Sequence, residues 1–492
     1  MPIRAFATGL LIAFSWTNLL AASKRTVVVI SDTHFGVGHR NGEWHPWEDF
    51  RWQTEFARFL AFIGANGSTD LVLNGDTFEL WQSLSPCASV DAEIGCSQDE
   101  AVQRIKSVLA EHNDEIRALQ AFASRGSNRI YVVPGNHDAA ILFPAVRAEV
   151  ERKLGANVVR ADGEWRSQDH RILAVHGHQF DEANRFPNWP KPFTRDGEHL
   201  QRPWGEYFVQ QFFNDVEERY PIVDNITREA DGMLYGLMAD GMKTLPSGLR
   251  FGRFIVFESS WRQGAGTAGG SSTTENRGKT EWDVKAIRHQ GPNFFADSLP
   301  IGHPARAQFV EAAKQGRFDK AFEELTDDDV RAICDARAVR YAEDGAVSLC
   351  PDVNAGGWLM EIVDFGHTRL KNYLKTFTPN GKPDFDVAIL SHTHQFEKPI
   401  QLKFDSGGPV TYVNTGAWQR VISAAEVAKR RKATGLSMGD VLKTWKITDL
   451  PACYPFVVIK PYDIKPTVRL RFWTQGSGDQ WEVADKCLST MP

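Results

Sequence analysis

The chain has 492 residues, of which 42% are hydrophobic and 24% charged, so it can bury the core of one large domain or of roughly two to three ordinary ones. A net charge of −6 and a pI near 6.2 give no basic field, which argues against a protein that binds nucleic acid nonspecifically. The composition is that of a globular protein.

Residues 1–22 have the pattern of a secretory signal peptide. Arg4 precedes the apolar stretch 5–16, and small residues follow at 21–23. The apolar stretch is too short and too interrupted to span a membrane. We therefore expect a secreted or periplasmic protein. The alternative interpretations are an N-terminal helix packed on the body and a cytoplasmic location.

Six cysteines form an even set without a CxxC motif or zinc-finger spacing. Pairing of nearest neighbours would join Cys87 with Cys96, Cys334 with Cys350, and Cys453 with Cys487. Each bridge would lie outside the predicted strands, although six cysteines allow fifteen pairings. Disulfides fit an exported protein, and buried free thiols in a cytoplasmic enzyme are the alternative.

The first predicted strand, residues 26–30 (TVVVI), is a compact β-branched run that ends just before Asp32 and His34. Both side chains are expected at the carboxyl edge of the strand, on the same side of an extended backbone. Residues 49–63 then show apolar side chains at helical spacing. His39 and His45 lie in the loop between and are expected to be solvated.

The second predicted strand, residues 70–73, is followed by Gly75, Asp76 and Glu79. Glycine lets the backbone pass close to a ligand, so Asp76 is expected to face the same crevice as Asp32. The charged segment 98–123 is predicted to form a solvated helix on the sheet.

The third predicted strand, residues 129–133, leads into Gly135, Asn136 and His137. An apolar run that ends in a tight glycine turn predicts a buried strand. It would deliver the Asn136 amide, the His137 imidazole and the Asp138 carboxylate to the edge of the sheet, where the amide and the imidazole can bind a metal or move a proton.

The fourth and fifth predicted strands, residues 171–175 and 386–390, each end in two histidines one residue apart: His176 and His178, then His392 and His394. Alternate side chains of an extended segment project to one side. One His-x-His pair is often incidental. Five strand ends that each carry Asp, Asn or His are poorly explained by chance, and they predict one functional edge.

Oxygen and imidazole ligands without thiolate suit manganese, zinc or iron, and the candidates suffice for two ions that share one carboxylate. Two ions about 3.5 to 4 Å apart can activate a water between them and clamp the oxygens of an in-line phosphoryl displacement. The reaction that such a site serves best is hydrolysis of a phosphate ester or anhydride.

Five motifs resemble, in the same order, those of the calcineurin-like metallophosphoesterases: DTH at 32–34, GDTFE at 75–79, GNHD at 135–138, HGH at 176–178 and SHTH at 391–394. The strand pattern and the resemblance together imply an α/β fold, a two-sheet αββα sandwich with a large, mainly helical insertion. The chain then divides into a discontinuous core (25–180 and 380–475), an insertion (181–379) and a C-terminal tail (476–492).

The resemblance implies two divalent or mixed-valence metal ions, manganese, zinc or iron, and a metal-bridging hydroxide as the nucleophile. It places the first ion on Asp32, His34, Asp76 and His394. It makes Asp76 the bridge and completes the second site with Asn136, His176 and His392. His178 is the alternative to His176, and Ser391 replaces a glycine of the family's last motif.

His137 would assist the leaving group from outside the metal shell, and Glu79 would orient it where many relatives have Asp. The implied substrate is a phosphate ester: a phosphomonoester, a phosphodiester or a pyrophosphate. The stretch GDTFELW also resembles the subgroup that contains the UDP-diacylglucosamine hydrolases of lipid A synthesis, which lack the long insertion.

The insertion is expected to decide substrate choice. It opens with a Pro- and aromatic-rich loop at 186–193 and contains a Gly/Ser/Thr-rich stretch at 264–278, read as a loop or mobile lid. Helical periodicity occurs at 207–220, 226–242, 304–325, 327–341 and 358–376. Three interpretations of the insertion remain open. It is a cap over the metals with Arg250 and Arg253 as phosphate contacts, a purely structural elaboration, or a cap in peripheral contact with a membrane.

After the last motif, strands are predicted at 410–413, 456–460 and 467–473, the last two completing a second sheet, and a basic helix at 424–432. Two other function classes compete with the enzyme. One is a catalytically silent metal-binding or scaffold protein on the same fold, and the other a metal-dependent hydrolase of a non-phosphorus bond. Nothing in the sequence fixes an oligomeric state.

Overall fold

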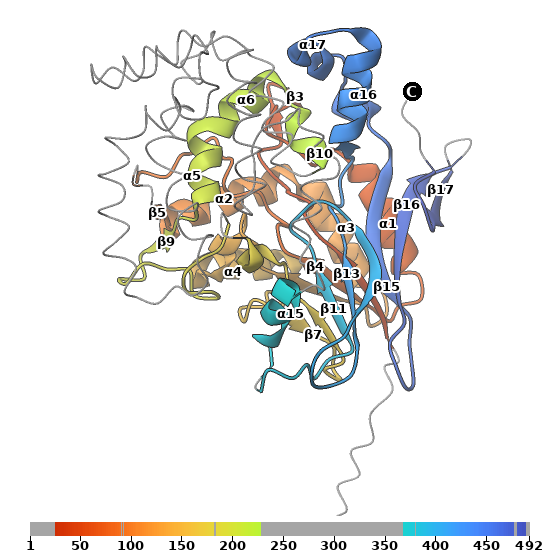
Figure 1. The fold of residues 1–492 in the computed structure, drawn as a ribbon. Coiled ribbons are helices and arrows are strands. Elements are labelled where there is room, and N and C mark those ends of the chain that lie inside the picture. Colours follow the sequence, from red (N-terminus) through yellow and green to blue (C-terminus); the bar gives the residue numbers. More distant parts are fainter. Residues whose placement is uncertain are drawn as a thin grey trace, which may run out of the picture.

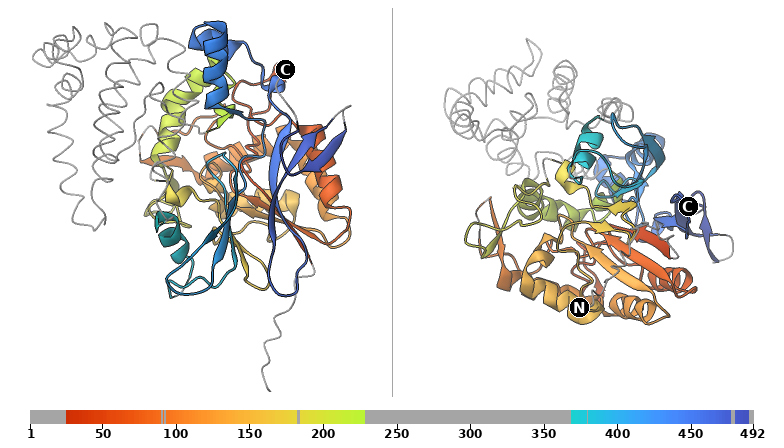
Figure 2. Two further views of the ribbon diagram at one scale, coloured as in Figure 1. Left: turned by 45° about the vertical axis from the view of Figure 1, so that its right-hand side comes forward. Right: turned by 90° about the horizontal axis from the view of Figure 1, so that it is seen from below.

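The structure, a computed structural model, describes residues 25–488 apart from 90, 92, 182–183, 228–367, 379 and 477–479. Two sheets pack face to face, and helices cover their outer faces (Figure 1; Figure 2). This is the α/β sandwich that the sequence predicts. The expected signal peptide, Cys334 and Cys350, Arg250 and Arg253, and the helices expected at 304–341 lie outside the described residues.

The larger sheet has six strands in the order β17-β16-β15-β1-β4-β6. In chain order they are β1 (Thr26–Ile30), β4 (Thr69–Asn74), β6 (Arg129–Val133), β15 (Cys453–Ile459), β16 (Val468–Gln475) and β17 (Trp481–Ala484). The first three run parallel, and β15 pairs antiparallel with β1. The expectation that the last strands complete a second sheet is therefore wrong, because they extend the first sheet.

The smaller sheet has five strands in the order β12-β13-β11-β8-β7. They are β7 (Trp165–Arg166), β8 (Ile172–Ala174), β11 (Val387–Leu390), β12 (Glu397–Leu402) and β13 (Val410–Asn414). The central strands β8, β11 and β13 are parallel to one another. Their carboxyl ends therefore meet at one edge of the sheet.

Strand β1 shows how the layers are built. Val27 and Val29 face the second sheet and share an apolar cluster with Ile389 of β11, whereas Val28 and Ile30 face the helices. Because β1 is buried on both faces, it reads in the sequence as a continuous apolar run rather than an alternation.

Helices α1 (Gln53–Ile63), α2 (Gln98–Glu111), α3 (Asn113–Ala123) and α4 (Pro144–Leu154) pack on the larger sheet, and α15 (Thr368–Lys375) packs on the smaller one (Figure 1). The segment predicted as one solvated helix is two helices that meet at His112. Their apolar faces are buried, since Ile105 and Leu119 are fully covered.

The start of the insertion packs against a C-terminal helical pair. Its elements are α5 (Trp204–Phe208), the π-helix η3 (Val209–Phe213), α6 (Asn214–Arg219), η4 (Val223–Asn225) and β10 (Ile226–Thr227). The opposing elements are β14 (Ile422–Ser423), α16 (Ala424–Thr434) and α17 (Met438–Lys443). Because β10 pairs with β14, residues 226–227 are a strand and not the start of a helix.

The remaining described elements are short and lie in the connections. They are the strand pairs β2 (His39–Arg40) with β3 (Glu43–Trp44) and β5 (Ile94–Ser97) with β9 (His199–Gln201), and the 3-10 turns η1 (Ala139–Leu142), η2 (His178–Phe180) and η7 (Ile447–Asp449). His39 is exposed as expected, but His45 is buried.

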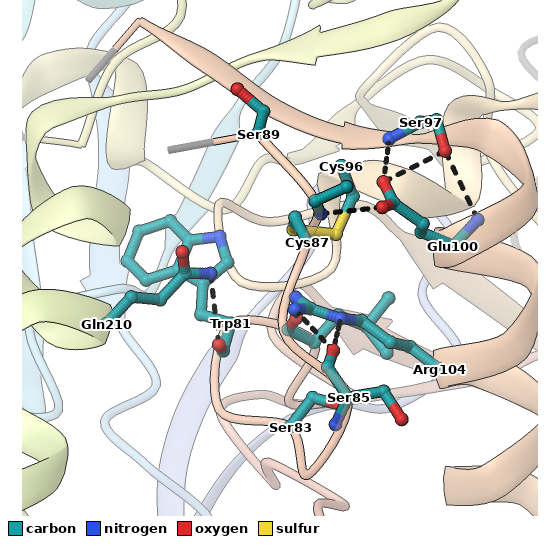
Figure 3. The surroundings of a disulfide bond; sticks show 12 residues. Trp81, Ser83, Ser85, Cys87, Ser89, Cys96, Ser97, Glu100, Arg104 and Gln210 are labelled. Carbon is teal, nitrogen blue, oxygen red and sulfur yellow. Dashed lines mark hydrogen bonds between the residues drawn. A yellow bond between two sulfur atoms is a disulfide. The ribbon is translucent and has the colours of Figure 1, made fainter. Parts of the chain in front are cut away.

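Two of the expected disulfides are present, Cys87–Cys96 and Cys453–Cys487. Cys96 lies in β5 and Cys453 in β15, so the expectation that the bridges lie outside strands is wrong. Figure 3 shows the first bridge beside Arg104, whose Nε and Nη2 atoms donate to the Ser85 carbonyl oxygen. The two disulfides fit an oxidising compartment. In the part of the chain that the structure describes, no helix is both long and apolar enough to cross a membrane.

Candidate metal centre

The predicted site residues follow five strands whose carboxyl ends meet at one edge of the sandwich. The loops after β1 and β4 are hydrogen-bonded to each other: the Asp32 N–H donates to the Gly75 carbonyl (3.1 Å) and the His34 N–H to the Asp76 carbonyl (3.0 Å). The loops after β8 and β11 are joined in the same way, because the Ser391 N–H donates to the His176 carbonyl (2.8 Å).

The backbone is left-handed at five of the predicted ligands. The φ angles of Asp32, His34, Asp76, His392 and His394 lie between 47° and 73°. Such angles are uncommon for residues other than glycine and cost roughly 1–3 kcal/mol each unless the surroundings enforce them. The last histidine pair is therefore not extended as the sequence reading assumed, and its two rings enter different clusters.

Two glycines make room for the ligands. A Cβ atom on Gly75 would overlap the ring of His176, and one on Gly135 would overlap the carboxylate of Asp76. Gly75 also has a positive φ of 89°, which glycine adopts without steric cost. The glycines of these two motifs thus permit close approach of the side chains that follow neighbouring strands.

The first cluster contains Asp32, His34 and His394, whose ligand atoms all lie within 4.8 Å of one another. Nε2 of His394 lies 3.2 Å from Nε2 of His34 and 3.5 Å from Oδ1 of Asp32. Asp32 is fully buried, and neither of its carboxylate oxygens makes a hydrogen bond within the described part of the chain. Burial raises the pKa of Asp32, but His394 and His176 outweigh it and lower the pKa overall.

The second cluster contains Asp76, His176 and His392, again with ligand atoms within 4.8 Å of one another. Nε2 of His176 lies 2.8 Å from Oδ2 of Asp76 and 3.1 Å from Oδ1 of Asn136. Burial raises the pKa of Asp76, but the charges of His176 and His137 hold it well below its ordinary value. Burial lowers the pKa of His176, and the Asp76 carboxylate more than compensates and raises it to about 9.

These donors fit bound cations. Buried carboxylates and imidazoles without hydrogen-bond partners are unfavourable unless a charge compensates them. Nδ1 of His34 lies 3.0 Å from Oε2 of Glu79, and Nδ1 of His176 lies 2.9 Å from the Asn74 carbonyl oxygen. Hydrogen bonds at Nδ1 leave Nε2 of both rings as the atom that could bind a metal, which is a common arrangement in metal sites.

His137 stands beside the first cluster and contacts Glu79. Its Nδ1 atom lies 2.5 Å from Oε2 of Glu79, the same oxygen that contacts His34. The indole of Trp81 stacks on the His137 ring at 3.9 Å between centroids. Burial raises the pKa of Glu79, but His137 and His34 lower it to about 2.

His178 is placed differently from His176. Its ring packs edge-on against Trp189 at 4.3 Å between centroids, and η2 begins at this residue. Burial, with the nearby charges of His176 and His392, holds the pKa of His178 well below its ordinary value. Of the two candidates, His176 is the one that contacts Asp76 and Asn136.

Three further residues support the site, and the sequence assigned a role to none of them. Asp138 accepts from the backbone N–H groups of Gly135 (2.6 Å) and Thr77 (2.8 Å) and so ties two motif loops together. Burial and the Asp76 charge raise the pKa of Asp138 to about 7. Asn74 donates to the hydroxyl of Ser391 (2.8 Å). The sequence predicted the Asp138 carboxylate at this edge as part of the GNHD motif, whereas Asn74 carried no distinguishing signal.

The third is Asp181, whose Oδ2 atom lies 3.1 Å from Nε2 of His392. It follows the HGH motif by three residues, and only the tertiary structure brings it to the last motif.

Residues 25–247 match the family model of the calcineurin-like phosphoesterases. Over these residues the chain carries a calcineurin-like metallophosphoesterase domain. The match ends before the SHTH motif, so the structure adds His392 and His394 of this metallophosphoesterase to the two clusters. No curated protein matches the chain significantly.

Proposed function

We propose that this metallophosphoesterase hydrolyses a phosphate ester with two bound metal ions. The observation that carries the proposal is the pair of buried clusters at one edge of the sandwich, with His137 beside them. Family membership and the clusters support a metal-dependent phosphoesterase, and the number of ions and the substrate are our inference.

The first ion would be held by Asp32, His34 and His394, and the second by Asn136, His176 and His392, with Asp76 shared between them. Oxygen and nitrogen donors of this kind suit manganese, zinc or iron. Two such ions supply Lewis acidity, activate a water and neutralise charge on the phosphoryl oxygens.

The chain itself would supply a proton and its orientation. Glu79 accepts from Nδ1 of His137, so Nε2 is the atom that can donate a proton to the leaving-group oxygen. The indole of Trp81 covers the His137 ring, and the backbone N–H of Trp81 donates to Oε1 of Glu79 (2.6 Å). Both oxygens of the Glu79 carboxylate are thus held in place. His137 would therefore be the catalytic acid and Glu79 its positioning residue.

The substrate would be a phosphomonoester, a phosphodiester or a pyrophosphate. The site chemistry is common to all three, and the insertion is proposed to choose among them. The two disulfides support a proposed secreted or periplasmic location.

The test uses the full chain, stripped of metal and reloaded separately with Mn²⁺, Zn²⁺ or Fe²⁺. Bound metal is counted by elemental analysis. Turnover is measured on p-nitrophenyl phosphate, bis(p-nitrophenyl) phosphate, nucleotides and lipid phosphates, with p-nitrophenyl acetate as the non-phosphorus control. We expect two ions per chain and phosphate-ester turnover that chelation abolishes.

Two results would overturn the proposal. Tight binding of two ions without turnover on any phosphate substrate indicates a catalytically silent protein. Hydrolysis confined to the acetate ester indicates a hydrolase of non-phosphorus bonds.

A further inference from the structure

Three histidines of the two clusters each contact an acceptor through one ring nitrogen, and the acceptors are of different kinds. His34 contacts Glu79 through Nδ1, and His176 contacts a backbone carbonyl through Nδ1. His392 has the opposite arrangement. Its Nε2 atom faces Oδ2 of Asp181 at 3.1 Å, and its Nδ1 atom is buried and makes no hydrogen bond within the described residues.

This contact constrains where the proton of the imidazole sits. An ionised carboxylate can only accept hydrogen bonds, so Nε2 of His392 must carry the hydrogen in order to face Asp181. A neutral ring with its hydrogen on Nε2 has its lone pair on Nδ1. Nδ1 is then the atom that can join Asp76 and His176 in the second cluster.

Asp181 is itself held in place. Its Oδ2 atom also accepts from Nδ2 of Asn184 (2.7 Å), and its backbone N–H donates to the His178 carbonyl (3.0 Å) at the end of η2. A Cβ atom on Gly205 would overlap Asn184, so Asn184 packs directly on α5, further along the same insertion. The Asp181 side chain is 40% exposed, whereas that of Glu79 is 1% exposed.

We propose that Asp181 is a positioning residue for the second metal ion: it fixes the Nε2–H tautomer of His392 and so presents Nδ1 to the ion. The inference rests on the proposed function, because it takes His392 as a ligand. Asp181 lies at the first position of the insertion, so the segment expected to choose the substrate also holds a ligand of the metal centre.

The test measures metal affinity and the tautomer of His392 in the full chain. Metal-free wild type, Asp181→Ala and Asp181→Asn are titrated with Mn²⁺ and with Zn²⁺ by calorimetry. Loss of a hydrogen bond to a ligand residue usually lowers metal affinity about 10- to 100-fold. We therefore expect Asp181→Ala to lower the metal affinity of one of the two sites by that factor and to leave the affinity of the other unchanged. Asp181→Asn retains a neutral acceptor oxygen and should fall between wild type and the alanine variant.

A spectroscopic measurement separates positioning from a general structural effect. Nitrogen-15 histidine correlation spectra of metal-free protein, with His392→Gln to assign the signal, report which ring nitrogen carries hydrogen. Wild type should show the Nε2–H form, and Asp181→Ala should shift toward the Nδ1–H form. Asp384→Ala is the matched control, since Asp384 is a half-exposed carboxylate paired with Arg166.

The outcomes are distinct. Wild-type affinity at both sites and an unchanged His392 signal in Asp181→Ala would overturn the inference and leave the proposed function standing. Failure of wild type to bind two ions would instead contradict the proposed function. An equal loss in Asp384→Ala would show that removal of any negative charge suffices, which also overturns the role of Asp181.

Discussion

Oε2 of Glu79 lies 2.5 Å from Nδ1 of His137 and, at the same time, 3.0 Å from Nδ1 of His34. One carboxylate oxygen therefore orients the proposed proton donor and a proposed metal ligand. The proposed catalytic acid and the proposed first metal site are therefore connected through a single residue, and substitutions at the three positions should have different consequences.

Replacement of His137 by alanine should lower kcat by about 10²- to 10⁴-fold, the usual contribution of a general acid, while both ions remain bound. The ring contacts Glu79 and Trp81 and packs edge-on against His34, but it belongs to neither of the two clusters, so its removal should leave their ligand atoms in place. Turnover and metal content are measured on the same preparation. Undiminished turnover with normal metal content would refute the catalytic role.

Glu79→Gln should impair both functions of the carboxylate. An amide oxygen is a weaker acceptor than a carboxylate, so metal affinity at the first site should fall together with kcat. Substrates with a good leaving group, which need little protonation, should recover part of the lost rate. A loss of kcat without any change in metal affinity would show that the contact with His34 is incidental.

Asp76→Asn should reduce the bound metal from two ions to one or none, because the proposed bridge loses its charge. The carboxylate contacts His176 through Oδ2 and the His137 N–H through Oδ1, and Asn can preserve only part of this pattern. Equilibrium dialysis followed by elemental analysis gives the stoichiometry. Two ions held with wild-type affinity would contradict the bridging role.

Gly135→Ala should destabilise the folded protein by about 1–3 kcal/mol, the usual effect of forcing atoms into a packed site, and should weaken metal binding. The added methyl group would overlap the Asp76 carboxylate. Gly408→Ala is the matched control, since a Cβ there meets nothing within 4 Å. Chemical denaturation of both variants gives the comparison, and equal stabilities would contradict the prediction.

His112 should make stability depend on alkaline pH. Its ring lies between Glu48 (3.3 Å) and Glu115 (3.5 Å), and all three are buried. Burial opposes the charged ring, but the two carboxylates raise the pKa of His112 from 6.5 to about 10. The protonated ring therefore stabilises the fold fully below pH 6.5, and this contribution is lost as pH rises through about 10.

The measurement is the unfolding free energy of metal-free wild type and His112→Gln between pH 6 and pH 10. The difference between the two proteins should be largest at pH 6 and should shrink toward pH 10. Subtraction of the variant removes the titration of other groups. A difference that stays constant with pH would show that His112 is neutral in the folded protein.

The local pattern of the sequence was sufficient for the core strands and the metal-centre motifs. Residues 26–30 and 129–133 are continuous β-branched or apolar runs closed by polar turns, and β1 and β6 have those bounds. The Cys87–Cys96 and Cys453–Cys487 pairs agree with nearest-neighbour pairing, which was one of the fifteen pairings that the sequence left open. These features depend on residues that are close in the sequence, where backbone preference and side-chain pattern act directly.

The tertiary structure decided what depends on distant partners. Strands β15 and β16 joined the first sheet, because β15 forms its hydrogen bonds with β1, more than 400 residues earlier. The choice of His176 at the second cluster, the left-handed turn at His392 and the contact of His392 with Asp181 likewise depend on loops that meet only after the two sheets pack. The sequence determined which residues gather at the carboxyl edge of the sheets, and packing determined which atom of each faces its neighbour.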